Sequence, residues 1–230
     1  MKWLIYPHQP RPDGSLSNLQ LLRLVRGASR VYWGIVLALI LGTQLVKVEL
    51  LEAMRIPPYI VGLLLTYWGI LLLYGAGPIT SHWSKMSKAC CFLGLILLYF
   101  TPFLYWWEQA PEEIYYAVNA FLFWSCTIFI LVLLNQMASE LALRTKDKLF
   151  ALEAHLSVWA VVLMLGIPLL LTVIYAFYFG LRHQTSPFAH LKVLIQGSPG
   201  HMSIIVLLPF ALTIINLWKT KQKCIDLMRN

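Results

Sequence analysis

The chain has 230 residues and a formal net charge of +8 at pH 7, with 59% hydrophobic and only 12% charged residues. Soluble domains carry about a quarter charged residues, so this composition excludes an ordinary soluble domain. The basic residues flank apolar segments instead of gathering on a polar domain, which indicates anionic lipid headgroups, and no nucleic acid, as their partner. We therefore expect one membrane-embedded domain.

Six apolar segments predict six membrane-spanning helices, because a helix needs about 20 predominantly apolar residues to cross the hydrocarbon core. No Asp, Glu, Lys or Arg falls inside any of them. The predicted spans are residues 31–46, 59–77, 89–107, 114–138, 156–181 and 202–218. The expected fold is an all-α, polytopic integral membrane protein with a cytoplasmic N-terminal segment (1–30), a six-helix transmembrane bundle (31–218) and a basic cytoplasmic tail (219–230).

The distribution of basic residues predicts the orientation of these spans. With the N-terminus in the cytoplasm, all but four of the 18 Lys and Arg residues fall on the cytoplasmic side, as the positive-inside rule requires. The exceptions are Lys47, Arg55, Arg182 and Lys192. We therefore expect both termini in the cytoplasm. The sequence has no Asn-x-Ser/Thr site, which fits a bacterial cytoplasmic (inner) membrane protein.

Residues 19–30, before the first span, have helical spacing, with Arg23, Arg26 and Arg30 on one stripe and apolar residues on another. This pattern predicts an amphipathic interfacial helix on the inner leaflet. In the alternative arrangement the segment continues the first span into the cytoplasm, since Gly27 is its only break. In both arrangements we expect the three arginines to bind the phosphates of lipid headgroups.

Small residues recur at helical spacing in the first two spans, where they allow two helix backbones to approach closely. The predicted helix-packing residues are Gly34, Ala38 and Gly42 in the first span and Gly62, Thr66 and Gly69 in the second. We expect them to form a contact inside the bundle, and a subunit interface is the alternative.

Tryptophans near the ends of the spans predict an aromatic belt at each membrane interface. The predicted inner belt contains Trp33, Trp83, Trp159 and Trp218. Trp68 and Trp124 lie in the middle of their spans, which predicts that they pack between helices.

Proline interrupts three spans, at Pro102, Pro168 and Pro209. Each proline removes a backbone hydrogen bond and is expected to kink its helix. Broken helices of this kind are typical of transporter binding sites, but the two halves of the chain show no matching internal repeat.

Two segments outside the spans also predict helices. Residues 140–155 keep a helical pattern, which predicts a helical hairpin with Thr145 as the N-cap of its second helix. Residues 186–195 predict a short external helix that begins at a Ser-Pro pair and either lies on the membrane surface or plugs the bundle.

Histidines and cysteines are the residues most able to bind a metal. His183, His190 and His201 flank the external helix, but their spacing matches no compact ligand motif, which favours ordinary interfacial histidines. The cysteines show no C-x-x-C spacing and are expected to behave as small apolar residues. Cys90 and Cys224 fall on the predicted cytoplasmic side, where labelling of their thiols would report the topology.

No segment carries a recognisable catalytic or cofactor motif. The absence of ionisable residues from the spans disfavours an ion-coupled transporter. The leading hypothesis is a non-catalytic membrane subunit or scaffold that acts through helix–helix contacts with other membrane proteins or with itself. The alternative is a channel, carrier or lipid-handling protein for a neutral or amphipathic substrate, and a membrane enzyme using the external histidines is a third class.

Overall fold

The computed structural model describes residues 16–42, 57–110, 112–182 and 200–229. These residues form helices joined by turns. The helices are α1 (Asn18–Gly42), α3 (Ile60–Gly75), α4 (Ser81–Gln109), α5 (Ile114–Arg144), α6 (Lys148–Val161), the π-helical turn η2 (Val162–Gly166), α7 (Ile167–Arg182) and α9 (Gly200–Arg229). Because α6, η2 and α7 follow one another without a break, the described part of the chain forms six helical rods.

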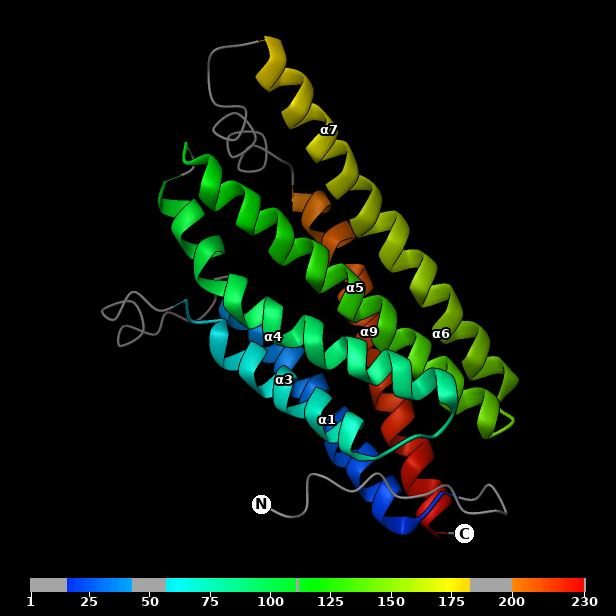
Figure 1. Cartoon of the computed structure of the whole chain (residues 1–230). Helices are drawn as coiled ribbons and strands as arrows, with labels where there is room; N and C mark the ends of the chain where they lie inside the picture. Colours follow the sequence, from blue (N-terminus) through cyan, green and yellow to red (C-terminus); the bar gives the residue numbers. More distant parts are fainter. Residues whose placement is uncertain (1–15, 43–56, 111, 183–199, 230) are drawn as a thin grey trace.

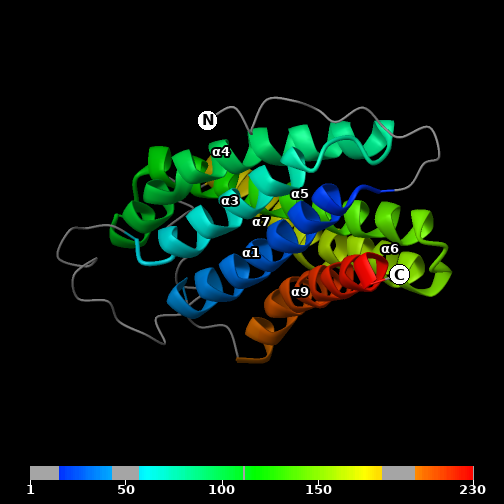
Figure 2. The ribbon, with the colours of Figure 1, turned by 90° about the horizontal axis from the view of Figure 1, so that it is seen from below.

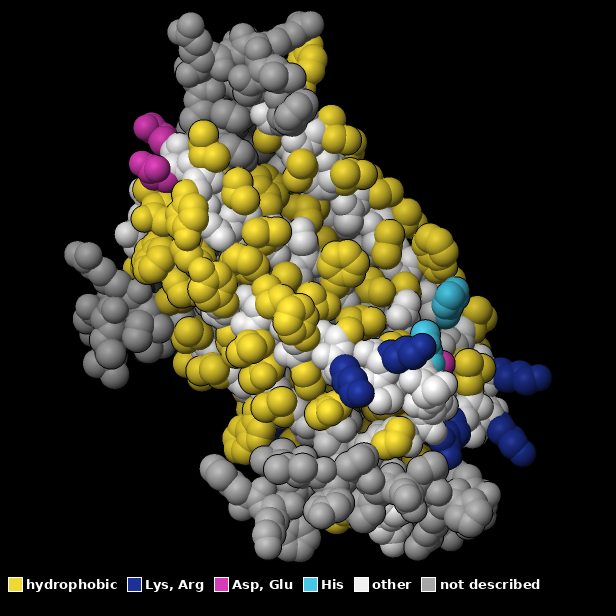
Figure 3. Space-filling view, viewed as in Figure 1, with side chains coloured by type: hydrophobic (Ala, Val, Ile, Leu, Met, Phe, Trp, Pro, Cys, Tyr) yellow, Lys and Arg dark blue, Asp and Glu magenta, His cyan; other side chains and the backbone are white. Residues whose placement is uncertain are grey.

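The rods alternate in direction along the chain (Figure 1). The first turn of α1, the last turn of α9 and the α3–α4 and α5–α6 connections therefore lie at one end of the bundle. We call this end the basic end, because Lys and Arg side chains gather there (Figure 3). Viewed from the basic end, α1 lies between α3 and α9, and α4 lies on the other side of α3 (Figure 2). Helix α5 packs against α4, α6 and α9.

Among the described residues, four helices are long and apolar enough to cross a membrane: Asn18–Gly42, Ser81–Trp107, Ile114–Arg144 and Lys148–Ala176. The apolar helix α3 is shorter, with 16 residues. Large apolar side chains cover the surface of the bundle away from the basic end (Figure 3). Soluble monomers rarely expose apolar surface on this scale, so the fold fits a membrane-embedded protein.

Helix α1 corrects the prediction of a separate interfacial helix. Residues 19–30 form the first turns of one continuous helix, as in the alternative arrangement. Their apolar residues Leu21, Leu24 and Ala28 are buried against neighbouring helices, so this stripe packs on protein. The helix begins with a capping box, in which Ser17 N–H donates to Gln20 Oε1 and Gln20 N–H donates to Ser17 Oγ. The predicted external helix, 186–195, lies outside the described residues.

The helical hairpin predicted for residues 140–155 is confirmed by α5 and α6, but its cap was assigned to the wrong residue. Thr145 follows the last turn of α5, and its hydroxyl donates back to Ala142 O. Lys146 then adopts a left-handed backbone with φ 59°, which ends α5. The N-cap of α6 is Asp147, whose Oδ1 accepts from Phe150 N–H at 3.1 Å.

Two tryptophans lie in environments opposite to those predicted. Trp83, predicted in the inner belt, is only 1% exposed and packs in the core near the start of α4. Trp68, predicted between helices, is 53% exposed on α3. Position along a span does not say which side of the helix a residue occupies. The other tryptophans predicted for the inner belt, Trp33, Trp159 and Trp218, are exposed.

Candidate functional site

The closest contact between helices joins α1 and α3 through small residues. A Cβ atom added at Gly34 would lie 2.4 Å from Thr66 Oγ1, and one added at Gly62 would lie 2.3 Å from the backbone nitrogen of Ala38. Such distances leave no room for any side chain. The Thr66 hydroxyl donates to Gly62 O within its own helix, so its polar group is satisfied in the contact.

The same contact continues toward the basic end through Gly27 and Gly69. A Cβ atom at Gly69 would lie 2.6 Å from Val31 N, and one at Gly27 would lie 2.8 Å from Leu73 Cδ2. Gly27 was interpreted from the sequence only as a helix break, although it repeats seven residues before Gly34 on the same face. Gly42 lies apart from the contact, because a Cβ there would meet Tyr59 Cβ at an ordinary 3.9 Å. The other predicted packing residues therefore lie at a contact between two helices of the same molecule.

A buried network of polar side chains joins α5 to α9. Asn135 Nδ2 donates to Leu131 O and to Thr213 Oγ1, each at 2.8 Å, and Asn135 Oδ1 accepts from Asn216 Nδ2 at 2.7 Å. All three side chains are buried. The Asn135 amide thus uses both of its donors and its acceptor, as a polar group in an apolar environment must.

The three prolines lie in helices that remain continuous. Pro209 is buried in α9, where Thr213 Oγ1 donates to its carbonyl oxygen at 2.9 Å. Pro102 lies inside α4, next to the fully buried Thr101. Pro168 follows the π-helical turn η2, which widens the helix where the proline ring would clash with the preceding turn.

Side-chain contacts tie the helices together at the basic end. Lys223 Nζ on α9 lies 3.0 Å from Asp147 Oδ2, and Lys219 on the same helix pairs with Glu153 on α6. The hydrogen bond from Lys223, helped by Phe150 N–H, holds the pKa of the Asp147 carboxyl below its usual range. Asp147 is therefore ionised at neutral pH and both caps α6 and binds the end of α9. Both pairs are partly exposed to solvent, so their contribution to stability is small.

Arginine side chains also bind carbonyl groups at helix ends there. Arg144 donates to Ile79 O in the α3–α4 connection, and Arg23 donates to Gly75 O at the end of α3. Arg23 was predicted to bind a lipid headgroup. In the structure its guanidinium donates to the backbone carbonyl of Gly75. Arg26 is exposed and Arg30 is partly exposed on the outer side of α1.

The candidate metal ligands and the cysteines offer no assembled site in the described residues. His183 and His190 lie outside those residues, and the side chain of His201, in the first turn of α9, is not described. The described part of the chain contains no group of three or more His, Cys, Asp or Glu that could hold a metal ion. Cys90 and Cys224 are buried, and burial raises the pKa of the Cys224 thiol to about 12, so neither cysteine suits topology labelling.

Comparisons of the chain with known protein families, with curated proteins and with solved structures find no match.

The α1–α3 contact predicts opposite effects for two glycine substitutions. Gly62→Ala should lower the free energy of unfolding by about 1–3 kcal/mol, because its Cβ forces the two backbones apart. Gly42→Ala is the matched control and should leave stability unchanged or slightly higher, since alanine favours a helix by about 1 kcal/mol over glycine. Thermal unfolding of the purified protein in mild detergent measures both. Equal effects of the two substitutions would contradict the close contact.

The α5–α9 network predicts that Asn135→Ala costs about 1–2 kcal/mol, because it removes two bonds between helices and leaves Asn216 without that acceptor. Asn119→Ala provides the control. The Asn119 side chain donates to Tyr115 O within its own helix, so its loss should cost less. Denaturation in mixed micelles would compare the two variants, and a cost of Asn119→Ala equal to that of Asn135→Ala would rule out the interhelical role.

Proposed function

We propose that this protein is a non-catalytic integral membrane subunit or scaffold that acts through contacts between its helices and partner membrane proteins, or a second copy of itself. The observation that carries the proposal is the exposure of α7. The rod formed by α6, η2 and α7 is the least buried of the four long apolar helices. Among the α7 side chains that the structure describes, only Ala176 is buried.

Helix α7 diverges from the bundle after the π-helical turn and Pro168. It extends beyond its neighbours at the end opposite the basic end (Figure 1). Its exposed side chains are large and apolar, among them Leu170, Leu171, Ile174 and Tyr178. Such a surface is suited to a transmembrane helix of a partner, since association in a bilayer depends on van der Waals packing and hydrogen bonds between helices.

The interior of the bundle supports the same function. The small residues of α1 and α3 meet each other, and Asn135, Thr213 and Asn216 bond one another. Polar side chains that are satisfied inside the protein act as links between helices. The exposed apolar side chains of α7 then remain available to a partner.

A channel, carrier or lipid-handling protein for a neutral or amphipathic substrate is the second candidate. It is favoured by the π-helical turn η2 and by the prolines inside helices, Pro102, Pro168 and Pro209, because such positions allow segments of a helix to move relative to one another. In this case α7 would contact lipid or substrate and no second protein.

We further propose six membrane crossings, with both termini in the cytoplasm of a bacterium and the basic end at the inner leaflet. The proposal is supported by the alternating direction of the rods and by the charges at their ends. Basic residues flank the α5–α6 connection, whereas Glu112 and Glu113 directly precede α5, whose first turn lies at the opposite end (Figure 1). This difference follows the positive-inside rule.

Introduced cysteines at the two ends test this orientation. A membrane-impermeant maleimide added to intact cells should label Glu112→Cys, because this residue is exposed at the predicted outer end. It should label Leu149→Cys, at the exposed start of α6, only after the membrane is permeabilised. The unmodified protein gives the background from its native thiols. Reversed accessibility, or labelling of both positions from outside, would overturn the orientation.

Photo-crosslinking from α7 tests the function. A photoreactive amino acid at Leu170 or at Ile174 should form an adduct with one defined protein in cells, because both side chains are exposed on α7. The control is the same amino acid at Phe92, an equally exposed position on α4. Adducts with lipid alone from all three positions would contradict the subunit function and favour the second candidate.

A further inference from the structure

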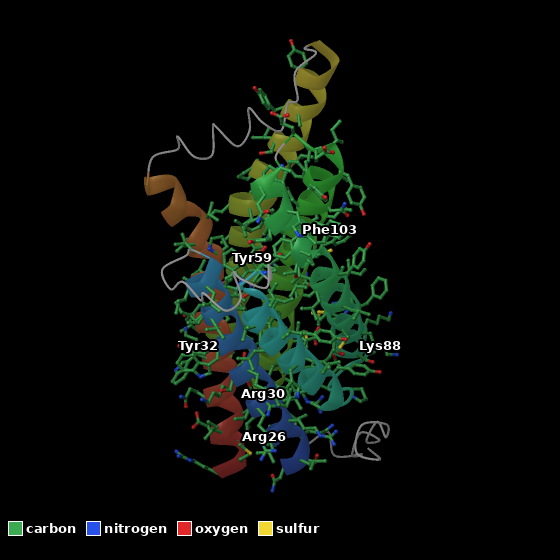
Figure 4. All side chains as sticks on the ribbon, turned by 90° about the vertical axis from the view of Figure 1, so that its left-hand side faces the viewer. Arg26, Arg30, Tyr32, Tyr59, Lys88 and Phe103 are labelled. Carbon is green, nitrogen blue, oxygen red and sulfur yellow. The ribbon has the colours of Figure 1, made fainter. Side chains whose placement is uncertain are left out.

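Aromatic and cationic side chains border the outer side of α1 on both flanks. On the α3 side, Arg30 Cζ lies 3.8 Å from the centroid of the Trp68 ring. On the α9 side, the Tyr32 and Trp218 rings lie 5.7 Å apart, and Lys221 Nζ lies 4.8 Å from the Trp218 ring. Arg26, Arg30 and Tyr32 follow one another along this part of α1 (Figure 4).

The arginines on this surface have unused hydrogen-bonding capacity. In the described part of the chain, the carboxylates that form ion pairs do so with Lys219 and Lys223, and neither Arg26 nor Arg30 joins them. Arg30 lies over one face of the Trp68 indole, which leaves the N–H groups at the edge of its guanidinium free to donate. A guanidinium held in this way presents a planar set of donors that matches the oxygens of a phosphate group.

An apolar surface continues from these arginines in the direction away from the basic end. On α3, Val61, Leu64 and Trp68 are exposed and lie about one turn apart on the same side of the helix. On α1, Trp33 and Ile40 are exposed beyond Arg30. The surface is therefore polar and cationic at one end and apolar along the rest of its length, as a phospholipid is.

The α1–α3 contact holds the two parts of this surface in register. Gly69, next to Trp68, packs against Val31, next to Arg30. Because the two backbones are in contact there, Arg30 and Trp68 extend from neighbouring positions on the two helices. The two parts of the surface are therefore side by side before a ligand binds, which lowers the entropy cost of binding.

We propose that the outer faces of α1 and α3 bind one anionic phospholipid from the leaflet at the basic end, with its phosphate on Arg26 and Arg30 and an acyl chain along Trp68, Leu64 and Val61. A basic residue near the surface of a leaflet attracts anionic lipid. This proposal goes beyond the proposed function and does not depend on any partner protein.

Lipid titration of the purified, delipidated full-length protein tests the proposal. Native mass spectrometry would count the bound lipids while phosphatidylglycerol or phosphatidylcholine is added to the detergent solution. The unmodified protein should bind one phosphatidylglycerol about tenfold more tightly than phosphatidylcholine, because only the former carries a net negative charge. Equal affinity for the two lipids would overturn the proposal, whatever the variants show.

Two double variants with the same change in net charge complete the test. R26Q/R30Q should weaken phosphatidylglycerol binding about tenfold and leave phosphatidylcholine binding unchanged. K85Q/K88Q removes two exposed lysines of α4 near the basic end and should change either affinity less than about twofold. Unfolding temperatures of both variants verify that the bundle is intact. An equal loss in K85Q/K88Q would show general attraction to the basic end and overturn the specific site.

Discussion

The backbone contact between α1 and α3 determines where the arginines Arg23 and Arg30 of α1 meet α3. Glycine at four positions, Gly27, Gly34, Gly62 and Gly69, lets the two helices approach until a Cβ atom at any of them would clash with the facing helix. This approach places Arg23 at the last carbonyl groups of α3 and Arg30 over Trp68. In a bilayer, where lipid is as apolar as leucine, such packing is a main source of attraction between helices. A wider separation would remove both arginine contacts together.

Polar groups in the interior have a different distribution from polar groups at the basic end. Inside, the hydroxyl and amide groups of Asn135 and Thr213 bond one another or nearby backbone carbonyls, which links α5 to α9. At the basic end, charged side chains link helices through partly exposed ion pairs and carbonyl contacts. The hydrogen bonds of the interior avoid the free-energy cost of an unsatisfied polar group in an apolar medium. At the basic end, water and lipid headgroups can solvate the charged side chains.

The sequence predicted an all-helical chain with long apolar helices, four of which in the described residues could cross a membrane, because long uncharged apolar segments have few other stable structures. It also predicted most of the α1–α3 contact from the four-residue spacing of small residues. The predictions from sequence were wrong where the role of a residue depends on the contacts it makes in the folded chain. Gly27 suggested a break, although it is a contact residue, and Thr145 and Asp147 are both good N-caps by type. Trp68 and Trp83 were misplaced because hydropathy gives depth in a span and does not identify the neighbouring helix.

The two ends of the bundle are stabilised to different degrees, and this difference suggests how the protein is used. At the basic end, Asp147 and Glu153 bind the lysines of α9, and Arg144 binds the α3–α4 connection. Toward the opposite end, α7 has mainly exposed side chains and departs from its neighbours after η2. A rigid end next to charged lipid headgroups would anchor the bundle, while the less constrained helix could adjust to a partner at little cost to the core. Binding at α7 would then leave the α1–α3 surface and its arginines unchanged.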